Sequence, residues 1–499
     1  MGISRVIFRS DMIHCLICEN APCTAACPHM DPARELRSIW FADENTAAAR
    51  IPDPVPCADC DAPCEKACIA SQGVSIRKLM MKAASLKEPA FLPDPGDDDL
   101  LKTDICGIPV RNPFLLSSSV VGSTYDMCAR AFEAGWAGAA FKTICLMDIH
   151  EASPRFSCIK SDTGSIVAFK NIEQLSDHAL VENLDAFRRL KRDYPDHFLL
   201  ASIMGRNEEE WAYLAEEVEK TGADALELNL SCPNMTKEGT GSDVGQVPEL
   251  VEKYTRAVKN ACSIPVIAKL TPNVTSMSEA ALAAYRGGAD GIAAINTIKS
   301  LMVMDKENFE FSPHVKGKTA VGGLSGETVK PIALRFIAEI CEHPEIRNLH
   351  ISGMGGIETW EDALEFMALG ADTVQVTTSV MEYGYRIVED LCGGLKCFMK
   401  LQGIKHVSEL TGMSLRMVVD TSEIERDTVI YPKFIHATCI GCERCYVSCR
   451  DGGHQAIRPG ADRKPILDAK RCVGCHLCVL ICPSGSIVSS GIRVKKKCE

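Results

Sequence analysis

Between residues 101 and 410, short apolar runs alternate with helical patterns, and this alternation constrains the fold of the 499-residue chain most strongly. Helical segments such as Glu208–Thr221 and Pro248–Ala261 separate the runs. The predicted strands are Pro113–Ser118, Ala139–Thr143, Leu199–Met204, Ala225–Leu230, Val266–Leu270, Gly291–Asn296, Leu349–Ser352 and Thr373–Thr377. Eight strands alternating with helices predict an α/β chain with a (β/α)8 TIM barrel. A doubly wound sheet is the alternative, but no G-x-G-x-x-G opens a helix, so a Rossmann nucleotide site is not supported.

Polar side chains occur where the predicted strands end, and in such barrels the chemistry collects at these ends. They are Ser117, Ser118, Lys142, Thr143, Asn229, Ser231, Lys269, Thr271, Asn296 and Thr297. The turns Ser352–Gly356 and Val376–Ser379 are suited to presenting backbone N–H groups to a phosphate. A lysine such as Lys269 is costly to bury unless it meets an anion or an electron-rich cofactor. The pattern predicts a flavin site; the alternative is a set of ordinary polar residues at a barrel mouth.

The stretch Leu226–Gln246 ends a strand with a thiol. Its apolar run leads to Asn229, Ser231 and Cys232 and then opens into a Gly-rich loop. A cysteine there is placed to reach over a bound flavin and substrate, and its ordinary pKa near about 8.5 suits a proton donor at neutral pH. The alternative is that Cys232 is a small buried hydrophobic residue, as lone cysteines usually are.

Most of the 26 cysteines fall into two segments, one near each end of the chain. In a large chain without a signal peptide, such sets indicate metal binding or catalysis rather than disulfides. The N-terminal set is Cys15, Cys18, Cys23 and Cys27, followed by Cys57, Cys60, Cys64 and Cys68. Eight thiols in two tight sets predict two [4Fe–4S] clusters, with zinc as the alternative because paired C-x2-C motifs also bind zinc. The segment Asp31–Arg50 between them is expected to be helical.

The C-terminal set has the spacing of a bacterial two-cluster ferredoxin. The run from Cys472 to Cys482 follows C-x2-C-x2-C-x3-C-P, whereas the run from Cys439 to Cys449 ends in Arg450 in place of proline. The fourth cysteine of each run serves the other cluster. One cluster is therefore expected on Cys439, Cys442, Cys445 and Cys482, and the other on Cys472, Cys475, Cys478 and Cys449.

These features divide the chain into three domains and two linkers. The expected organisation is a helical N-terminal iron–sulfur domain at 1–88, a linker at 89–100, the barrel at 101–410, a second linker at 411–433 and a ferredoxin-like domain at 434–499. Prolines at 89, 93 and 95 and the acidic run Asp97–Asp99 mark the first linker, because they cannot continue a helix.

Several motifs together resemble the dihydropyrimidine dehydrogenase family and, more distantly, the class 1 dihydroorotate dehydrogenases. They are NLSCPN (Asn229–Asn234), AKLTPNVT (Ala268–Thr275), INTIKSL (Ile295–Leu301), GGLSG (Gly322–Gly326) and SGMGGIETWEDALEF (Ser352–Phe366). The bacterial FMN-containing and iron–sulfur-containing subunit is the most similar form, although it usually lacks the N-terminal cysteines. These cysteines in turn resemble the N-terminal domain of the full-length family enzymes and of the glutamate synthase small subunit.

The resemblance implies roles for particular residues. Cys232 matches the general acid, and Asn171, Glu173, Asn229, Asn296 and Thr297 match the residues that bind the pyrimidine. FMN is expected to contact Ser118, Lys142, Thr143, Asn229, Lys269, Asn296, Gly326, Gly355, Gly356, Thr377 and Thr378. The implied N-terminal cluster ligands are Cys15, Cys18, Cys23 and Cys68 for one cluster, and Cys27, Cys57, Cys60 and Cys64 for the other. Met80 stands where the mammalian-type enzyme uses a glutamine ligand, and Cys57 is taken as its replacement.

The implied activity is reversible reduction of the C5–C6 double bond of uracil or thymine, with hydride from FMN N5 and a proton from Cys232. Electrons would pass through four [4Fe–4S] clusters from a separate NAD(P)H-oxidising FAD subunit or a ferredoxin, within a homodimer or heterotetramer. Alternatives are an enzyme acting on another ring substrate such as dihydroorotate, a non-catalytic electron-transfer subunit, and a zinc-binding structural module. The net charge of −12 argues against nucleic-acid binding. The absence of a long apolar run and of a signal peptide predicts a cytoplasmic protein without membrane spans.

Overall fold

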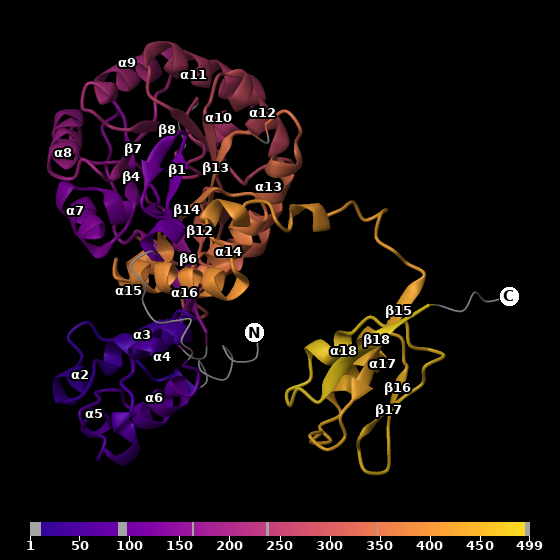
Figure 1. The fold of residues 1–499 in the computed structure, drawn as a ribbon. Helices are drawn as coiled ribbons and strands as arrows, with labels where there is room; N and C mark the ends of the chain where they lie inside the picture. The colour runs from indigo at the N-terminus through magenta and orange to yellow at the C-terminus, as the bar shows by residue number, and fades with distance from the viewer. Residues whose placement is uncertain (1–10, 88–96, 162–163, 236–238, 347, 495–499) are drawn as a thin grey trace. The chain divides into compact units, whose positions relative to one another are not determined.

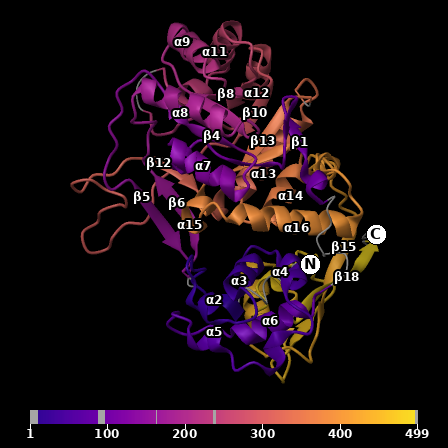
Figure 2. The ribbon, with the colours of Figure 1, turned by 60° about the vertical axis from the view of Figure 1, so that its left-hand side comes forward.

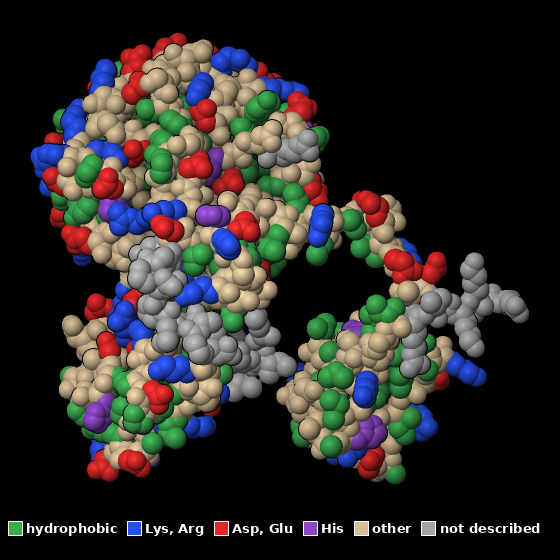
Figure 3. Space-filling view, viewed as in Figure 1, with side chains coloured by type: hydrophobic (Ala, Val, Ile, Leu, Met, Phe, Trp, Pro, Cys, Tyr) green, Lys and Arg blue, Asp and Glu red, His purple; other side chains and the backbone are tan. Residues whose placement is uncertain are grey.

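The structure is a computed structural model that describes residues 11–87, 97–161, 164–235, 239–346 and 348–494. The chain forms two compact units, Met1–Met417 and Val418–Glu499, and each is described by itself. Within the described part, no helix has the length and apolar character that crossing a membrane requires. Figure 3 shows acidic and basic side chains interspersed over the visible face of the barrel.

Unit 1 contains a closed barrel of eight parallel strands in the order β10-β13-β14-β3-β4-β7-β8-β9 (Figure 1). The strands are β3 (Phe114–Leu116), β4 (Gly138–Ile144), β7 (Phe198–Ile203), β8 (Ala225–Asn229), β9 (Val266–Lys269), β10 (Gly291–Ala294), β13 (His350–Met354) and β14 (Thr373–Val376). They are the eight strands predicted from the sequence, and the predicted TIM barrel is confirmed. Nearly every residue of these strands is buried, since helices cover one face and the barrel interior the other.

Helices surround the barrel and bury one apolar face each against it (Figure 1). They are α7 (Tyr125–Ala134), α8 (Leu180–Asp193), α9 (Glu208–Glu219), α11 (Pro248–Ala261), α12 (Ser278–Arg286), α13 (Lys330–Glu342), α14 (Trp360–Ala368) and α16 (Ile387–Gln402). Helix α11 has the predicted bounds and buries Val251, Tyr254 and Val258. Helix α9 begins where predicted but ends two residues early, at Glu219. The short helices α10 (Ser242–Gly245) and α15 (Thr378–Tyr383) follow β8 and β14.

A second sheet lies outside the barrel and was not predicted. It is antiparallel, in the order β11-β12-β6-β5, and consists of β5 (Phe156–Lys160), β6 (Ile166–Asn171), β11 (Ile298–Ser300) and β12 (Gly322–Ser325). Because β6 ends at Asn171 and β12 at Ser325, this sheet carries residues of the site described below. A further hairpin, β1 (Thr103–Ile105) and β2 (Ile108–Val110), packs against the barrel's interior cluster.

The N-terminal part of unit 1 is helical, as predicted, and packs against α16 (Figure 2). It contains α2 (Pro22–Ala26), α3 (Pro32–Trp40), α4 (Glu44–Arg50), the 3-10 helix η1 (Pro56–Asp59), α5 (Pro63–Lys66) and α6 (Ile76–Ala84). The prediction of one helix over Asp31–Arg50 is wrong. The chain breaks between α3 and α4, where Ala42 takes a left-handed φ of 61°. That turn is fixed because Ala42 O accepts a hydrogen bond from Trp360 Nε1 of the barrel.

The two predicted linkers contain more structure than expected. Most of 89–100 lies outside the described residues, but its end forms the 3-10 helix η3 (Asp97–Leu101). In the second linker, Gly412 and Ser414 donate backbone hydrogen bonds to the carbonyls of Met367 and Ala368 on the barrel. The remainder of 411–433 includes the start of a strand of unit 2, so the predicted boundary at 434 falls inside that strand.

Unit 2 is a small α/β domain built around the C-terminal cysteines. Strand β15 (Thr428–Phe434) pairs antiparallel with β18 (Ile487–Val494), and β16 (Ile457–Pro459) pairs with β17 (Pro465–Leu467). The helices α17 (Arg444–Gly452) and α18 (Leu477–Leu480) each overlap one cysteine run, because α17 contains Cys445 and Cys449 and α18 contains Cys478. Its core is separate from that of unit 1 and includes Cys445, Ile457, Cys478 and Ile487.

Candidate active site

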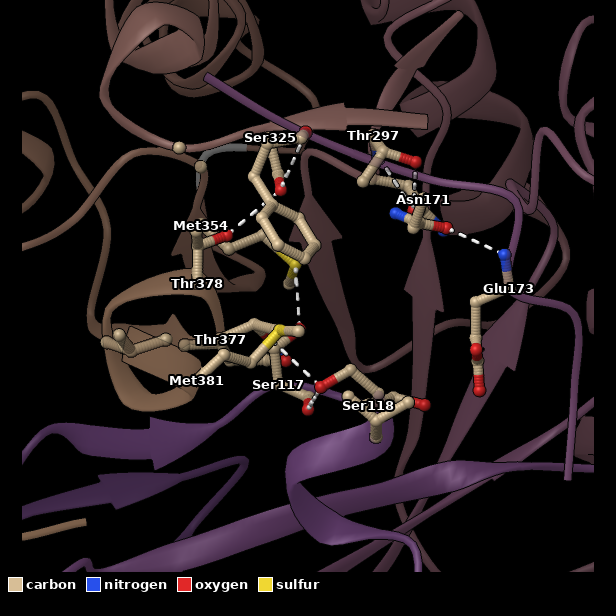
Figure 4. Close-up of a pocket in the computed structure, with 18 of the residues that line it drawn as sticks. Ser117, Ser118, Asn171, Glu173, Thr297, Ser325, Met354, Thr377, Thr378 and Met381 are labelled. Atoms are coloured by element: carbon tan, nitrogen blue, oxygen red, sulfur yellow. Dashed lines mark hydrogen bonds between the residues drawn. The ribbon is translucent and has the colours of Figure 1, made fainter. Parts of the chain in front are cut away.

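A cavity opens at the carboxyl ends of the barrel strands and is roofed by β6 and β12 (Figure 4). Its empty space is about 1220 Å³ when the open solvent at its mouth is included. All the catalytic, substrate-binding and flavin-binding residues expected from the sequence line it: Ser118, Lys142, Thr143, Asn171, Glu173, Asn229, Cys232, Lys269, Asn296, Thr297, Gly326, Gly355, Gly356, Thr377 and Thr378.

One end of the cavity is built from glycine turns and hydroxyl groups. Gly326, Gly355 and Gly356 adopt φ values of 92°, 119° and 82°, which side chains rarely tolerate. A Cβ on Gly356 would lie 2.8 Å from Lys330 Cβ. Thr378 Oγ1 donates to Ser325 Oγ at 2.9 Å, a contact marked in Figure 4. Backbone N–H groups exposed by such turns suit a phosphate, so this end fits the phosphate of FMN.

The middle of the cavity contains a lysine that the barrel interior neutralises. Lys269 is only 2% exposed, and its Nζ lies 3.3 Å from both Ser117 Oγ and Glu227 Oε1. Glu227 is fully buried; its Oε1 accepts from Ser202 Oγ at 2.9 Å, and its Oε2 has no hydrogen-bond partner in the described structure. The cation therefore sits on a buried carboxylate and can still face an electron-rich ring, which fits a flavin. Glu227 was not predicted from the sequence.

The other end of the cavity gathers amide side chains. Asn296 Nδ2 donates to Ser231 Oγ at 2.8 Å, and Asn229 Nδ2 donates to Thr143 Oγ1 at 2.8 Å. Asn234, which was not predicted, donates to Asn171 Oδ1 at 2.9 Å, while its own Oδ1 is buried without a partner. It connects the loop after β8 to the end of β6. Several amide donors and acceptors close together complement a flat ring with alternating N–H and C=O groups.

A group of four charged side chains borders the amide end. Glu173 forms ion pairs with Lys142, at 2.5 Å, and with Arg155, although the latter pair is not aligned as a hydrogen bond. Lys142 Nζ also lies 3.5 Å from Glu151 Oε1. Burial and the nearby Glu173 raise the pKa of Glu151. Glu173 is thus a neutralised rather than an isolated charge. Glu151 and Arg155 were not predicted from the sequence.

Cys232 lies in the wall of the same cavity as a buried thiol. It is 6% exposed, and burial raises its pKa to about 11, even though backbone N–H groups nearby act in the opposite direction. Its carbonyl accepts from Ser242 N at 2.9 Å. Gly241 has a φ of 57°, and a Cβ there would lie 2.4 Å from that carbonyl, so this turn requires glycine. The loop geometry holds a protonated thiol against the cavity, which is the state that a proton donor needs.

The sixteen clustered cysteines form four groups of four with the predicted memberships. Three groups each surround a small cavity: Cys15, Cys18, Cys23 and Cys68; Cys439, Cys442, Cys445 and Cys482; and Cys449, Cys472, Cys475 and Cys478. In the fourth group, Cys57 interacts electrostatically with Cys27 and Cys60, and Cys64 with Cys27 and Cys57. Among the residues described, no group of three or more potential ligands is arranged to hold a single metal ion. Thiols spread around a cavity fit a four-iron cubane better than a tetrahedral zinc.

Comparison with known proteins gives the same assignment for two segments. Residues 100–399 match the family model described as dihydroorotate dehydrogenase, and residues 433–489 match a 4Fe-4S dicluster domain. A solved dihydroorotate dehydrogenase from Eimeria tenella, in complex with ferulenol, superposes with a TM-score of 0.54 at 20% identity over 65% of this chain and 92% of its own. At that identity the superposition supports the fold alone.

Three curated relatives are more similar in sequence. The PreA subunit of the NAD-dependent dihydropyrimidine dehydrogenase of Escherichia coli K12 is 52% identical over 398 residues, which cover 79% of this chain and 97% of the relative. The chloroplastic NADP(+) dihydropyrimidine dehydrogenase of Arabidopsis thaliana is 39% identical over 63% of this chain and 77% of its own. The catalytic subunit of dihydroorotate dehydrogenase B from Pyrococcus abyssi is 36% identical over 64% of this chain and 100% of its own.

Proposed function

The chain belongs to the dihydroorotate dehydrogenase family, among its dihydropyrimidine dehydrogenase-type iron–sulfur flavoproteins, and we propose that it reversibly reduces the C5–C6 double bond of uracil or thymine. The observation that carries this proposal is the cavity, in which a buried thiol faces the same space as amide groups and a lysine suited to a flavin. As a dihydropyrimidine dehydrogenase-type oxidoreductase, it acts on CH–CH bonds.

Substrate binding is assigned to the amide end of the cavity. Asn171, Asn229 and Asn296 would pair with the carbonyl and N–H edges of the pyrimidine, Thr297 would add a hydroxyl, and Glu173 would accept from a ring N–H. Since Lys142 and Arg155 pair with the Glu173 carboxylate, the side chain is fixed in direction as an acceptor. Glu173 and Asn229 are buried, and the low dielectric around them strengthens their polar contacts.

Cys232 is assigned the proton step. FMN would be held by the glycine turns and by Lys142 and Lys269, and when bound it would supply hydride exchange with C6 of the pyrimidine and single-electron exchange with iron–sulfur clusters. In the reductive direction, the Cys232 thiol would give its proton to C5. With the hydride that the flavin would supply to C6, the C5–C6 double bond would become a single bond and two C–H bonds would form. The resulting thiolate then regains a proton from water. In the oxidative direction, the thiolate removes the C5 proton.

Electrons are proposed to arrive through four [4Fe–4S] clusters on the four groups of cysteines. An iron–sulfur domain is shown at 433–489, and the E. coli relative is named as a subunit, which supports a partner. A separate NAD(P)H-oxidising FAD subunit or a ferredoxin would supply the electrons, within a homodimer or heterotetramer. The N-terminal cysteines are proposed as the docking and relay site for that donor.

A second candidate substrate is dihydroorotate or another carboxylated ring. Two observations favour it: relatives that are named dihydroorotate dehydrogenases, and the cations Lys142 and Arg155 beside Glu173. The negative charge of Glu173 alone therefore does not exclude a substrate that carries a carboxylate. The 52% identity to a dihydropyrimidine dehydrogenase subunit favours the uncharged pyrimidine. A non-catalytic electron-transfer role is the third candidate, and full activity in a Cys232→Ala variant would support it.

Anaerobic titration of the cluster-replete protein tests the proposal. Dihydrouracil or dihydrothymine should bleach the flavin absorbance and dihydroorotate should not. Bleaching by dihydroorotate alone would replace the proposed substrate with the second candidate. Glu173→Gln should weaken dihydrouracil binding, because the amide cannot replace the carboxylate held by Lys142 and Arg155; an unchanged affinity would contradict the assigned role of Glu173.

A further inference from the structure

Arg386 connects the barrel to a cysteine loop of the N-terminal helices. It lies between α15 and α16, and its Nη2 and Nη1 donate to the carbonyls of Ile17 and Cys18 at 2.6 and 3.3 Å. Both carbonyls belong to the loop that begins the group Cys15, Cys18, Cys23 and Cys68. Ile17 takes a left-handed φ of 49°, which turns the loop toward the guanidinium. The cation is therefore fixed directly on one cluster site.

Other contacts hold the helices to the barrel without touching that loop. Arg37 Nε pairs with Asp390 Oδ2 at 2.6 Å, and both side chains are almost completely buried. Trp360 Nε1 donates to Ala42 O at 2.7 Å, and the ring of Phe41 meets that of Tyr383 edge-on with centroids 5.1 Å apart. Docking therefore does not depend on Arg386, so its contact with the cysteine loop can serve a separate purpose.

The segment that carries Arg386 also reaches the active-site cavity. Thr378, Met381 and Glu382 on α15 line the cavity, and only three residues separate Glu382 from Arg386. Cys64 of the other N-terminal group lies on α5, which Figures 1 and 2 show at the end of these helices away from α16. The group around Cys18 is therefore the one proximal to the barrel.

We propose that Arg386 is a positioning residue that raises the reduction potential of the proximal N-terminal cluster. The inference rests on the proposed function, because it requires a [4Fe–4S] cluster on Cys15, Cys18, Cys23 and Cys68. Such a cluster with four thiolates is anionic, and its reduction adds one electron without making or breaking a bond. A nearby cation stabilises the reduced form more than the oxidised form, and net charge is one determinant of cluster potentials. The electron donor is the separate flavoprotein or ferredoxin.

The ion pair between Arg386 and Glu19 does not cancel this effect. The two side chains lie 2.7 Å apart, but Glu19 is 77% exposed and Arg386 only 25%. Water and salt screen the exposed carboxylate, whereas the guanidinium lies against the loop. Of the two charges, the guanidinium is therefore the less screened one beside the loop.

Potentiometric titration of the full-length protein, followed by EPR, tests the inference. In Arg386→Gln, one cluster signal should require a lower potential: at a given potential its reduced-to-oxidised ratio should fall about tenfold, or ~59 mV for a one-electron couple. Arg386→Lys retains the charge and should stay near the wild-type potential. The matched control is Arg34→Gln, which removes an arginine paired with Glu389 at the same interface without contacting the cysteine loop, and it should shift no signal.

The outcomes separate the inference from the proposed function. Iron and sulfide contents for four clusters, with a potential that does not move in Arg386→Gln, would overturn the inference alone. An equal shift in Arg386→Lys or in Arg34→Gln would also overturn it, because loss of the charge at position 386 would not be the cause. Iron for only two clusters in the wild-type protein would instead refute the N-terminal cluster assignment. If Arg386→Gln loses its iron, the Arg386→Lys measurement still decides whether charge is sufficient.

Discussion

The pKa of Cys232 predicts how the rate of the oxidative half-reaction depends on pH. Burial raises this pKa to about 11, from an ordinary value of about 8.5, so the site favours the thiol over the thiolate by about 3 kcal/mol. Removal of the C5 proton from dihydrouracil needs the thiolate. At pH 8 only about one thiolate in 10³ is present, compared with about one in four for an unperturbed cysteine.

The rate of flavin reduction by dihydrouracil should therefore rise about tenfold per pH unit from pH 7 to 10 and level off near the pKa. In the direction of uracil reduction, the thiol is the active form, and the rate should be independent of pH over the same range. Anaerobic stopped-flow absorbance of the flavin, with saturating dihydrouracil in a single turnover, measures the first rate directly. Cys232→Ser should slow it by about 10²–10⁴-fold, because an alcohol ionises far less readily.

A plateau beginning at pH 8 to 9 would refute the reasoning, since it would mean that the thiol titrates as if exposed. A pH dependence that survives in Cys232→Ser would assign the proton step to another group. Glu151→Gln is the informative companion variant: the Glu151 carboxylate raises the pKa of Cys232, so its removal should shift the plateau to lower pH.

Three further predictions concern stability and the flavin. Arg37→Met should destabilise unit 1 by about 3–5 kcal/mol, because it removes the cation that pairs with the buried Asp390 carboxylate. Arg34 is more exposed, and Arg34→Ala should cost only about 0–1 kcal/mol. The midpoints of urea unfolding compare the two variants. Burial raises the pKa of Glu35 to about 7 despite its hydrogen bond to Arg50, so the contribution of Glu35 to stability is present below about pH 4 and lost as the pH rises through 7. Glu35→Gln should remove that part of the pH dependence of stability in the same urea assay. An unchanged pH dependence in this variant would contradict the prediction. Glu227→Gln should raise the reduction potential of the flavin by ~30 mV, which for a two-electron couple is a tenfold change in the reduced-to-oxidised ratio, because Lys269 then lacks its counter-charge. Dye-linked reduction measures the potential, and Ser202→Ala serves as the neutral control. Equal potentials in both variants would contradict the prediction.

The barrel was predictable because strands buried on both faces read as continuous apolar runs, and helices between them read at a period near 3.6. The cavity residues were predictable because polar groups at strand ends meet at one rim. The sheet β11-β12-β6-β5 was not. Its short strands are partly exposed, so they carry neither a continuous apolar run nor a clear alternation.

Glu227 shows what a closer reading of the sequence would have found. In β8, Leu226 and Leu228 face the helices, whereas Glu227 and Asn229 alternate with them and face the interior. A charged residue at such a position in a buried strand signals a partner across the barrel, here Lys269 of β9. In contrast, Arg155 and Glu151 follow no strand, and only the folded chain brings them to Glu173 and Lys142. Contacts such as Arg37 with Asp390 join segments more than 350 residues apart in sequence and leave no local pattern.

The packing of the N-terminal helices explains why they belong with the barrel. One continuous hydrophobic core includes Leu36, Trp40 and Phe41 of these helices together with Leu391 and Leu395 of α16. The cysteines of unit 2, in contrast, pack into a core of their own. For the N-terminal helices to leave the barrel, apolar surface and the Arg37–Asp390 pair would have to become exposed to water. This exposure would cost several kcal/mol. A donor that reached the proposed proximal cluster would therefore meet a site held at fixed geometry against α15. The relative potentials, which Arg386 is proposed to help set, would then decide in which direction an electron moves there.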